Sequence, residues 1–209
     1  MTESHATIWD KRFAENGWPT DPDPYLVELA RPLPPGRGLD LGSGPGRNSL
    51  WLAAAGWSMT LVDVSKVGLE QAAAGAERMD VAVTTINADV GTWEPESEGF
   101  DLVIVANLHP GPDMLGAILA RAAEALRTGG HLFVVGHHVS NLGHHGPPDP
   151  ERLLTVERLR AIMPAQLNIE VLSERERSRI QGTAHPGAST GRVVLGWAVK
   201  PTHHEGAGL

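Results

Sequence analysis

The stretch LDLGSGPGRN, residues 39–48, places three alternating glycines between a short apolar segment and a segment with helical periodicity. Glycine adopts left-handed backbone angles without steric penalty and lets other groups approach the main chain closely. Residues 37–41 before the glycines are typical of a strand, and residues 48–55 after them are typical of a helix. A glycine-rich turn at such a strand-to-helix junction predicts a ligand that contacts the backbone there.

The rest of the chain predicts an α/β fold, because strand-like and helix-like segments alternate on both sides of this turn. Strands are expected at 57–62, 81–86, 100–106 and 131–136, and helices at 7–16, 25–31, 65–79, 114–127 and 155–163. Ser65 is expected to cap the helix that follows it, and Gly129 with Gly130 to end the helix from 114. Two strands at 167–178 and 192–200, with no helix between them, are expected to pair antiparallel at one edge of a mainly parallel sheet.

Composition disfavours several classes of protein. The 209 residues carry a formal net charge of -8 and 41% hydrophobic residues, and they include no cysteine. An acidic chain disfavours a nucleic-acid or anionic-membrane surface, and a chain without cysteine has no disulfide or thiolate metal site. A polar N-terminus and the lack of a long apolar run favour a cytoplasmic protein. We expect one domain over 1–209, with a helical segment at 1–35 and a flexible tail at 201–209.

Acidic residues accompany three successive predicted strands. Asp40 directly precedes the glycine turn, Asp63 ends the second strand, and Asp89 follows the third. Because the carboxyl ends of parallel strands share one edge, these acids are expected to rim a common crevice. A carboxylate at Asp63 is placed to accept both hydroxyls of a ribose, and Asp89 with the backbone of Val90 is placed to hold a purine. The structural alternatives are a helix-terminal acid for Asp63 and a turn aspartate for Asp89.

The spacing of the glycines separates two kinds of nucleotide site. A dinucleotide site of the form G-x-G-x-x-G would need glycine at position 47, where Arg47 stands. A phosphate loop would need a G-K-[ST] sequence after the turn, and none is present. The pattern D-x-G-x-G-x-G from Asp40 instead suits a ligand without phosphate at this turn. A nicotinamide-dependent oxidoreductase is therefore the second hypothesis.

These motifs resemble those of the class I S-adenosylmethionine-dependent methyltransferases, and the wider pattern is similar to the tellurite-resistance and thiopurine-type small-molecule methyltransferases. The matching segments are IWDKRF, LDLGSGPGRNSLWLAAAGW, TLVDVS, FDLVIVANLHP, ALRTGGHLFVVGHH and GPPDPERLLTVERL. The resemblance implies a Rossmann-like, seven-stranded, mostly parallel sheet with the last strand antiparallel and helices on both faces. It also implies bound S-adenosyl-L-methionine and methyl transfer to a small-molecule acceptor.

The resemblance further implies which residues contact this cofactor. The glycine turn would pack against the methionine part, and Asp63 would hold the ribose. Asp89 and Val90 would flank the adenine, and Asn107 would face the reacting sulfonium. The full set of expected cofactor residues is Asp40, Gly42, Ser43, Gly44, Gly46, Arg47, Asp63, Val64, Ala88, Asp89, Val90 and Asn107.

The aromatic residues of the N-terminal segment are expected to form a lid. In similar proteins such a segment closes over the cofactor, and here it contains Trp9, Phe13 and Trp18. Simple packing of these side chains into the core is the alternative.

Histidines are the candidate catalytic residues. Methyl transfer from a sulfonium needs an oriented acceptor and at most a base, so no nucleophilic side chain is expected. His109 follows the fourth strand and is the candidate base, with a turn histidine as the alternative. His137 and His138 leave the fifth strand and are expected to line the acceptor pocket. No metal site is expected, because the histidine-rich loop has no recognised ligand spacing.

The expected partner is a small molecule, bound by a monomer or a homodimer. The sequence ANLHP departs from the [DN]-P-P-[YF] motif of methyltransferases that act on bases, since Leu108 and Pro110 replace proline and the aromatic residue. This mismatch and the acidic charge argue against a nucleic-acid substrate. A third hypothesis is a protein that binds S-adenosylmethionine without catalysis.

Overall fold

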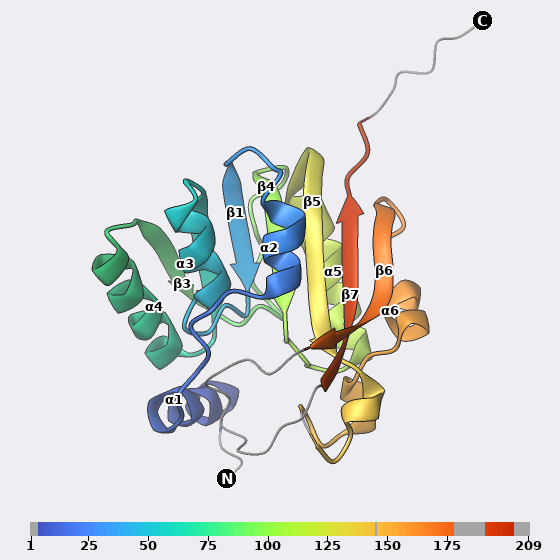
Figure 1. The fold of residues 1–209 in the computed structure, drawn as a ribbon, viewed down its shortest axis with the longest axis horizontal. Helices are drawn as coiled ribbons and strands as arrows, with labels where there is room; N and C mark the ends of the chain where they lie inside the picture. The colour runs from blue at the N-terminus through green and yellow to red at the C-terminus, as the bar shows by residue number, and fades with distance from the viewer. Residues whose placement is uncertain (1–3, 145, 178–190, 203–209) are drawn as a thin grey trace, which may run out of the picture.

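The computed structural model describes residues 4–144, 146–177 and 191–202. These residues form one seven-stranded sheet, in which only β7 runs antiparallel to its neighbours (Figure 1). In spatial order the strands are β3 (Val83–Asn87), β2 (Ser58–Asp63), β1 (Arg37–Leu41), β4 (Phe100–Ala106), β5 (Leu126–His137), β7 (Gly191–Val199) and β6 (Asn168–Arg177). The order reverses at β1 and β4, so the crevice expected for a ligand lies at their carboxyl ends.

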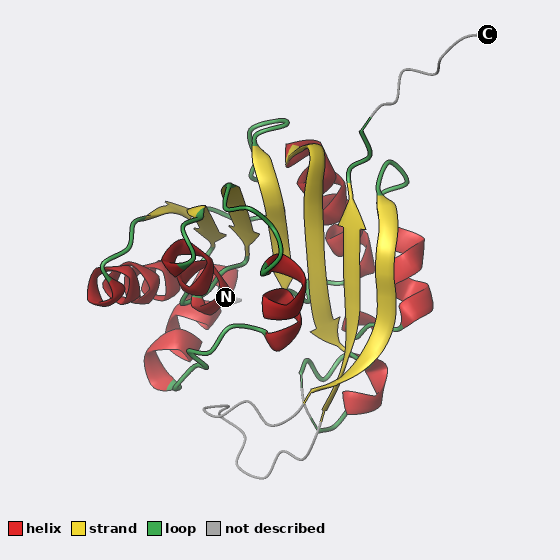
Figure 2. Cartoon of the chain, turned by 45° about the horizontal axis from the view of Figure 1, so that its top comes forward, coloured by secondary structure: helices red, strands yellow, loops and turns green. Residues whose placement is uncertain are grey.

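Helices cover both faces of the sheet (Figure 2). One face carries α2 (Pro24–Ala30), α3 (Arg47–Ala54) and α4 (Lys66–Met79), and the other carries α5 (Pro112–Ala125) and α6 (Val156–Ile162). The first helix, α1 (His5–Glu15), lies apart from both layers, beyond the carboxyl ends of the parallel strands (Figure 1). The predicted doubly covered sheet and its antiparallel last strand are confirmed.

The core forms two layers because successive strand residues point to opposite faces. In β4, Leu102 and Ile104 pack with α2, α3 and α4, whereas Val103 and Val105 pack with α5. All four side chains are buried, which explains why the sequence of this strand is apolar without interruption.

One junction differs from the sequence expectation. The expected helix to residue 127, ended by Gly129 and Gly130, is wrong, because α5 ends at Ala125 and β5 begins at Leu126. Leu126 is fully buried and pairs with Phe100, so tertiary pairing overrides the local helix signal. The two glycines lie inside β5, where their backbone groups exchange hydrogen bonds with Lys200.

The segment between β5 and α6 is ordered by short 3₁₀ turns. These turns span Val139–Asn141 and Pro150–Arg152, in the region expected to be a plain loop. The tail expected to be flexible, 201–209, lies outside the described residues from 203 onward. No helix in the described ranges is long and apolar enough to cross a bilayer.

Candidate functional site

The glycine turn connects the end of β1 to α3 in a conformation that requires glycine. Gly42, Gly44 and Gly46 all have positive φ, at 76°, 51° and 78°. A Cβ on Gly46 would lie 2.9 Å from Leu61 and 3.0 Å from Ala72, so packing as well as φ excludes a side chain there. The Gly42 N–H donates to the carbonyl of Val62 at the end of β2, which fixes the turn against the neighbouring strand.

Asp63 ends β2 and holds this turn from the side. Its Oδ2 accepts the N–H of Gly44 at 2.8 Å, and its Oδ1 accepts the N–H of Ser65 at 2.8 Å. The side chain is nearly buried, and this burial raises the pKa of Asp63 although both backbone donors oppose the rise. Carboxylate oxygens accept more than one hydrogen bond each, so Asp63 retains acceptor capacity for a bound hydroxyl.

Asp40 lies deeper, in β1, and is the second acid of the site. Ser49 Oγ donates to its Oδ2 at 2.7 Å. Desolvation raises the pKa of Asp40 to about 7, with a further contribution from the nearby Asp63 charge. Two buried carboxylates beside a glycine turn favour a ligand that brings positive charge close to the backbone. S-adenosylmethionine, which carries a sulfonium and an ammonium group, fits this requirement.

The third acid, Asp89, follows β3, as the sequence suggested. β3 ends at Asn87, and the exposed Asp89 lies two residues beyond it. Asp89 Oδ1 accepts the N–H of Gly91 at 2.8 Å, as in an aspartate turn, while Ala88 and Val90 are half-buried. Asp89 is therefore at the expected edge of the sheet, with one oxygen used locally.

Sequence reasoning missed Asn87. Its Nδ2 donates to the carbonyls of Asp63 at 3.1 Å and Val64 at 2.9 Å. These bonds order the end of β2 and the β2–α4 loop, where the predicted cofactor residues Asp63 and Val64 lie. The signal for Asn87 in the sequence was its position as a polar residue at the end of an expected strand.

The N-terminal aromatic residues gather over the glycine turn. Phe13 is buried against Gly44 and Gly68, where a Cβ on either glycine would approach its ring within 3.0 Å. The Phe13 ring lies 5.5 Å from the Trp9 ring and 4.8 Å from the Trp18 ring, centroid to centroid. These three side chains thus belong to the site edge rather than to either core layer.

Asp10 attaches α1 to this edge, and sequence reasoning did not identify it. Asp10 Oδ1 accepts from Ser65 Oγ at 2.6 Å and from the Val67 N–H at 3.1 Å. These bonds lower the pKa of Asp10. Ser65 also donates its N–H to Asp63, so a single residue connects α1 to the acid expected to hold the ribose.

On the other side of the crevice, Asn107 follows β4 in a left-handed conformation, with φ at 56°. Its N–H donates to Val135 in β5 at 2.7 Å, and its Oδ1 accepts from Arg177 Nη1 at 3.1 Å. Arg47, after the glycine turn, lies 3.7 Å from Asp23, measured from Nη2 to Oδ2. Asn107 and Arg47 were predicted, whereas Asp23 and Arg177 were not.

His109 is built into the packing of the acceptor side. Its Nδ1 lies 2.9 Å from the carbonyl of Arg152, and its Nε2 accepts the N–H of His137 at 3.3 Å. Burial lowers the pKa of His109 to about 4, so the ring is neutral near pH 7. With both nitrogens occupied, His109 connects the loop after β4 to the second 3₁₀ turn.

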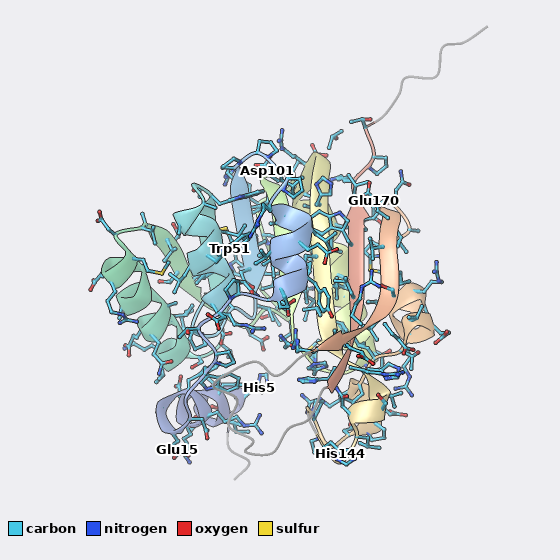
Figure 3. All side chains as sticks on the ribbon, viewed as in Figure 1. His5, Glu15, Trp51, Asp101, His144 and Glu170 are labelled. Carbon is cyan, nitrogen blue, oxygen red and sulfur yellow. The ribbon has the colours of Figure 1, made fainter. Side chains whose placement is uncertain are left out.

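Of the other histidines, His144 lies at the same edge as α1, opposite Asp101 (Figure 3). His138 caps the first 3₁₀ turn through its Nδ1, and its Nε2 lies 3.3 Å from Glu174 Oε1. The His137 ring lies 5.3 Å from that of His109, and Asn141 Nδ2 approaches its Nδ1 at 3.3 Å. In the described part of the chain, no three His, Asp or Glu side chains form a group that could hold a metal.

Comparisons with known proteins agree with this geometry. A family model described as a methyltransferase domain matches residues 39–130, which run from β1 into β5. The chain is 28% identical over 159 residues to the probable thiol methyltransferase 2 of Arabidopsis thaliana, covering 71% of this chain and 69% of the relative.

Solved structures share the fold. One, reported for the conversion of a disulfide bond into a thioacetal group during echinomycin biosynthesis, has a TM-score of 0.79 at 21% identity and covers 97% of this chain and 95% of its own. Another is a Burkholderia thailandensis 1,6-didemethyltoxoflavin-N1-methyltransferase with bound S-adenosylhomocysteine. Its TM-score is 0.62 at 23% identity, covering 86% of this chain and 77% of its own. Together with the glycine turn and the strand order, these likenesses show the Rossmann-like fold of methyltransferases, with residues 39–130 matching the methyltransferase domain.

Proposed function

We propose that this protein transfers the methyl group of S-adenosylmethionine to a small-molecule acceptor. The observation that carries the proposal is the pair of buried acids, Asp40 and Asp63, on adjacent strands beside a glycine turn with three positive φ angles. The family match over this same region and the methyltransferases among the similar proteins support it.

The cofactor roles follow from the chemistry of each group. Asp63 would accept the ribose hydroxyls, and Asp89 with Val90 and Ala88 would border the adenine. Asp40 and the glycine turn would face the methionine part, where a buried carboxylate stabilises positive charge. When bound, the cofactor supplies a methyl group that its sulfonium already activates. The chain then has to orient the acceptor and exclude water, which fits the docking of α1 over the turn.

On the acceptor side, we assign different roles to the three predicted histidines. His109 and His138 use their ring nitrogens to hold neighbouring groups, which supports positioning roles for both. His137 is half-buried at the end of β5 and is our candidate for contact with the acceptor. A thiol is the first acceptor to test, because the curated relative is a probable thiol methyltransferase.

Calorimetric titration of the full chain tests the cofactor assignment. S-adenosylmethionine and S-adenosylhomocysteine are expected to bind, and NAD is expected not to bind. A panel of small thiols, amines and phenols then tests catalysis through release of S-adenosylhomocysteine. Binding of NAD alone would favour the oxidoreductase hypothesis, and cofactor binding without turnover on any acceptor would favour a non-catalytic protein.

We also propose a cytoplasmic protein, monomeric or homodimeric, that does not act on nucleic acid. The net charge of -8 and the absence of cysteine support this proposal. Light scattering of the purified chain measures the oligomeric state directly.

A further inference from the structure

One arginine attaches the turn at residues 89–93 to the body of the fold, and the roles above leave this arginine unexplained. Arg121, in α5, donates from Nη2 to the carbonyl of Val90 at 3.3 Å and to the carbonyl of Gly91 at 2.5 Å. Its Nη1 lies 3.9 Å from Oε1 of Glu94, the residue after the turn. The Arg121 side chain is largely buried and Glu94 is exposed, so the two carbonyl bonds contribute more to the attachment than the ion pair does.

The sheet itself gives this turn little support. β3 is an edge strand, so β2 is its one neighbour in the described sheet. After β3, the Ala88 N–H donates to the carbonyl of Asp63 at 3.0 Å. The next backbone bonds are internal to the turn, from the N–H groups of Thr92 and Trp93 to the carbonyl of Asp89. These internal bonds fix the shape of the turn, whereas its position depends on what packs against it.

The helix α5 supplies the packing. Met114 and Arg121 lie seven positions apart, which is about two helical turns, so both side chains belong to one face of α5. A Cβ on Gly91 would lie 3.4 Å from Met114 Sδ, and Val90 packs against the core layer to which α5 contributes. α5 therefore holds the turn by apolar contacts and, through Arg121, by its backbone carbonyls.

Arg121 orients the Asp89 carboxylate through one peptide group. The carbonyl of Val90 and the N–H of Gly91 belong to the same planar peptide, in which they point in opposite directions. Arg121 donates to that carbonyl, and that N–H donates to Asp89 Oδ1 at 2.8 Å. The guanidinium therefore fixes the plane of the peptide, and the peptide fixes one oxygen of the carboxylate. The other oxygen of Asp89 is left to meet a ligand.

A carboxylate beside a backbone N–H can distinguish adenine from hypoxanthine. Adenine presents an amino donor next to a ring-nitrogen acceptor, which match a carboxylate oxygen and an N–H. Hypoxanthine presents a carbonyl acceptor next to an N–H donor, so both contacts would bring like groups together. A site discriminates between the two bases only when its own donor and acceptor are held in place.

We propose that Arg121 is a positioning residue that makes the site selective for adenine, by holding the Val90 carbonyl and, through it, the Asp89 carboxylate. This inference rests on the proposed binding of S-adenosylmethionine and adds a residue that determines base selectivity. Arg121 donates to carbonyls of the protein, so it acts through the turn and does not touch the base.

The wild-type protein provides the first test. It is titrated in a calorimeter with S-adenosylhomocysteine and with S-inosylhomocysteine, in which hypoxanthine replaces adenine and the rest of the molecule is the same. We expect the adenine ligand to bind at least about tenfold more tightly, because the inosine ligand mismatches both contacts. Equal affinities for the two ligands would overturn the inference.

Variants then assign the selectivity to Arg121. R121Q is expected to weaken S-adenosylhomocysteine about tenfold and to change S-inosylhomocysteine less than about twofold, so the ratio of the two affinities falls. R121K should restore part of the ratio, because an ammonium group also donates to carbonyls but lacks the planar fork. Equal losses for both ligands in R121Q would indicate a purely structural role and would contradict the proposal.

E94Q is the matched control. It removes the ion pair of Arg121 and leaves the bonds to the two carbonyls, so both affinities should equal those of the wild type. A fall in the ratio as large as that in R121Q would show that the ion pair, and not the carbonyl bonds, sets the selectivity.

A double-mutant cycle tests the route through Asp89. D89N replaces the carboxylate by an amide that can also donate to hypoxanthine, so it should lower the ratio by itself. If Arg121 acts through Asp89, adding R121Q to D89N should lower the ratio little further. Losses that add in full would overturn this route.

The two proposals fail in different ways. If the wild-type protein binds neither ligand, the proposed function is overturned, and the inference is overturned with it. If S-adenosylhomocysteine binds and R121Q keeps the wild-type ratio, the proposed methyl transfer stands and the role of Arg121 is excluded.

Discussion

The two halves of the crevice are built from contacts of very different range. In the cofactor half, around β1 to β3, Asp40 bonds to Ser49 and Asp63 bonds to Gly44, so the partners lie 9 and 19 positions apart. In the acceptor half, around β4 to β6, Arg177 bonds to Asn107 and Asp23, which lie 70 and 154 positions away. A motif can specify the first half, whereas only the folded sheet assembles the second.

The halves also differ in the titratable groups that they bury. The half around β1 to β3 buries Asp40 and Asp63, and burial raises the pKa of each. The half around β4 to β6 contains His109, whose pKa burial lowers, and the ion pair of Arg177 with Asp23. Two acids suit a cofactor that carries positive charge beside β1 and β2. The predictions below test this division, beginning with the largest expected effect.

Replacing Asp40 by Asn is expected to change the pH dependence of stability most. The pKa of Asp40 is about 7 in the folded chain against an ordinary 3.8, so the folded state binds this proton more tightly than the unfolded state. The resulting stabilisation is complete below pH 3.8 and is lost as the pH rises through about 7. For a fully buried group this amounts to roughly 4 kcal/mol, which D40N should abolish in urea unfolding followed at several pH values.

The matched variant H109Q should act with the opposite sign. The pKa of His109 is about 4 in the folded chain against an ordinary 6.5, so its stabilisation is complete above pH 6.5. This stabilisation is lost as the pH falls through 6.5 toward 4. In H109Q, the free energy of unfolding should no longer decrease over this pH range because of residue 109. The two groups titrate over the same pH range, so if D40N and H109Q changed the slope of stability against pH with the same sign, the opposite effects of burial on Asp40 and His109 would be wrong.

Removing the Asp63 carboxylate tests whether the half of the crevice around β1 to β3 determines the affinity for the cofactor. A hydrogen bond to a charged group contributes about 1.5–3 kcal/mol, so D63A should weaken S-adenosylmethionine binding about ten- to hundredfold. H109Q serves as the control and should bind the cofactor as the wild type does. Calorimetry measures both, and unchanged affinity in D63A would remove the ribose assignment.

The smallest effect is expected from loosening α1. D10N weakens the bonds from Ser65 and Val67, which should accelerate cofactor release about two- to tenfold without changing the fold. Release is followed by chasing radiolabelled S-adenosylhomocysteine from the loaded protein. E15Q removes the same charge from an exposed position of α1 and serves as the control, and equal rates in D10N and wild type would show that α1 does not retain the cofactor.

Most of the fold could be predicted from the sequence because the strands and helices have clear periodicity. The apolar run of β4 and the Ser65 cap of α4 needed no tertiary information. The start of β5 could not be predicted without tertiary information. Leu126 has the local sequence of a helix end, and only its pairing with Phe100 makes it part of a strand. There, pairing across the sheet decides between two local conformations that the sequence allows.

The residues of the candidate site differ in the same way, because some follow from local sequence and others only from the folded sheet. The placement of the glycine turn, Asp40 and Asp63 at one edge was predictable, because the turn and Asp40 lie at the end of β1 and Asp63 ends the neighbouring β2. Asp23 and Arg177 were not, since each looks like an ordinary surface charge until α2 and β6 meet beside Asn107. A fully buried aspartate has no signature in the sequence.

The aromatic cluster on α1 also gives the chain an optical reporter. Trp9 and Trp18 lie 6.2 Å apart beside Phe13 at the glycine turn, while the other four tryptophans, Trp51, Trp57, Trp93 and Trp197, belong to the body of the fold. A shift in indole emission on adding cofactor would report on the crevice, because Trp9 and Trp18 lie at the turn and Trp93 donates its backbone N–H to the carbonyl of Asp89. The native protein could be followed through binding and release without any attached dye.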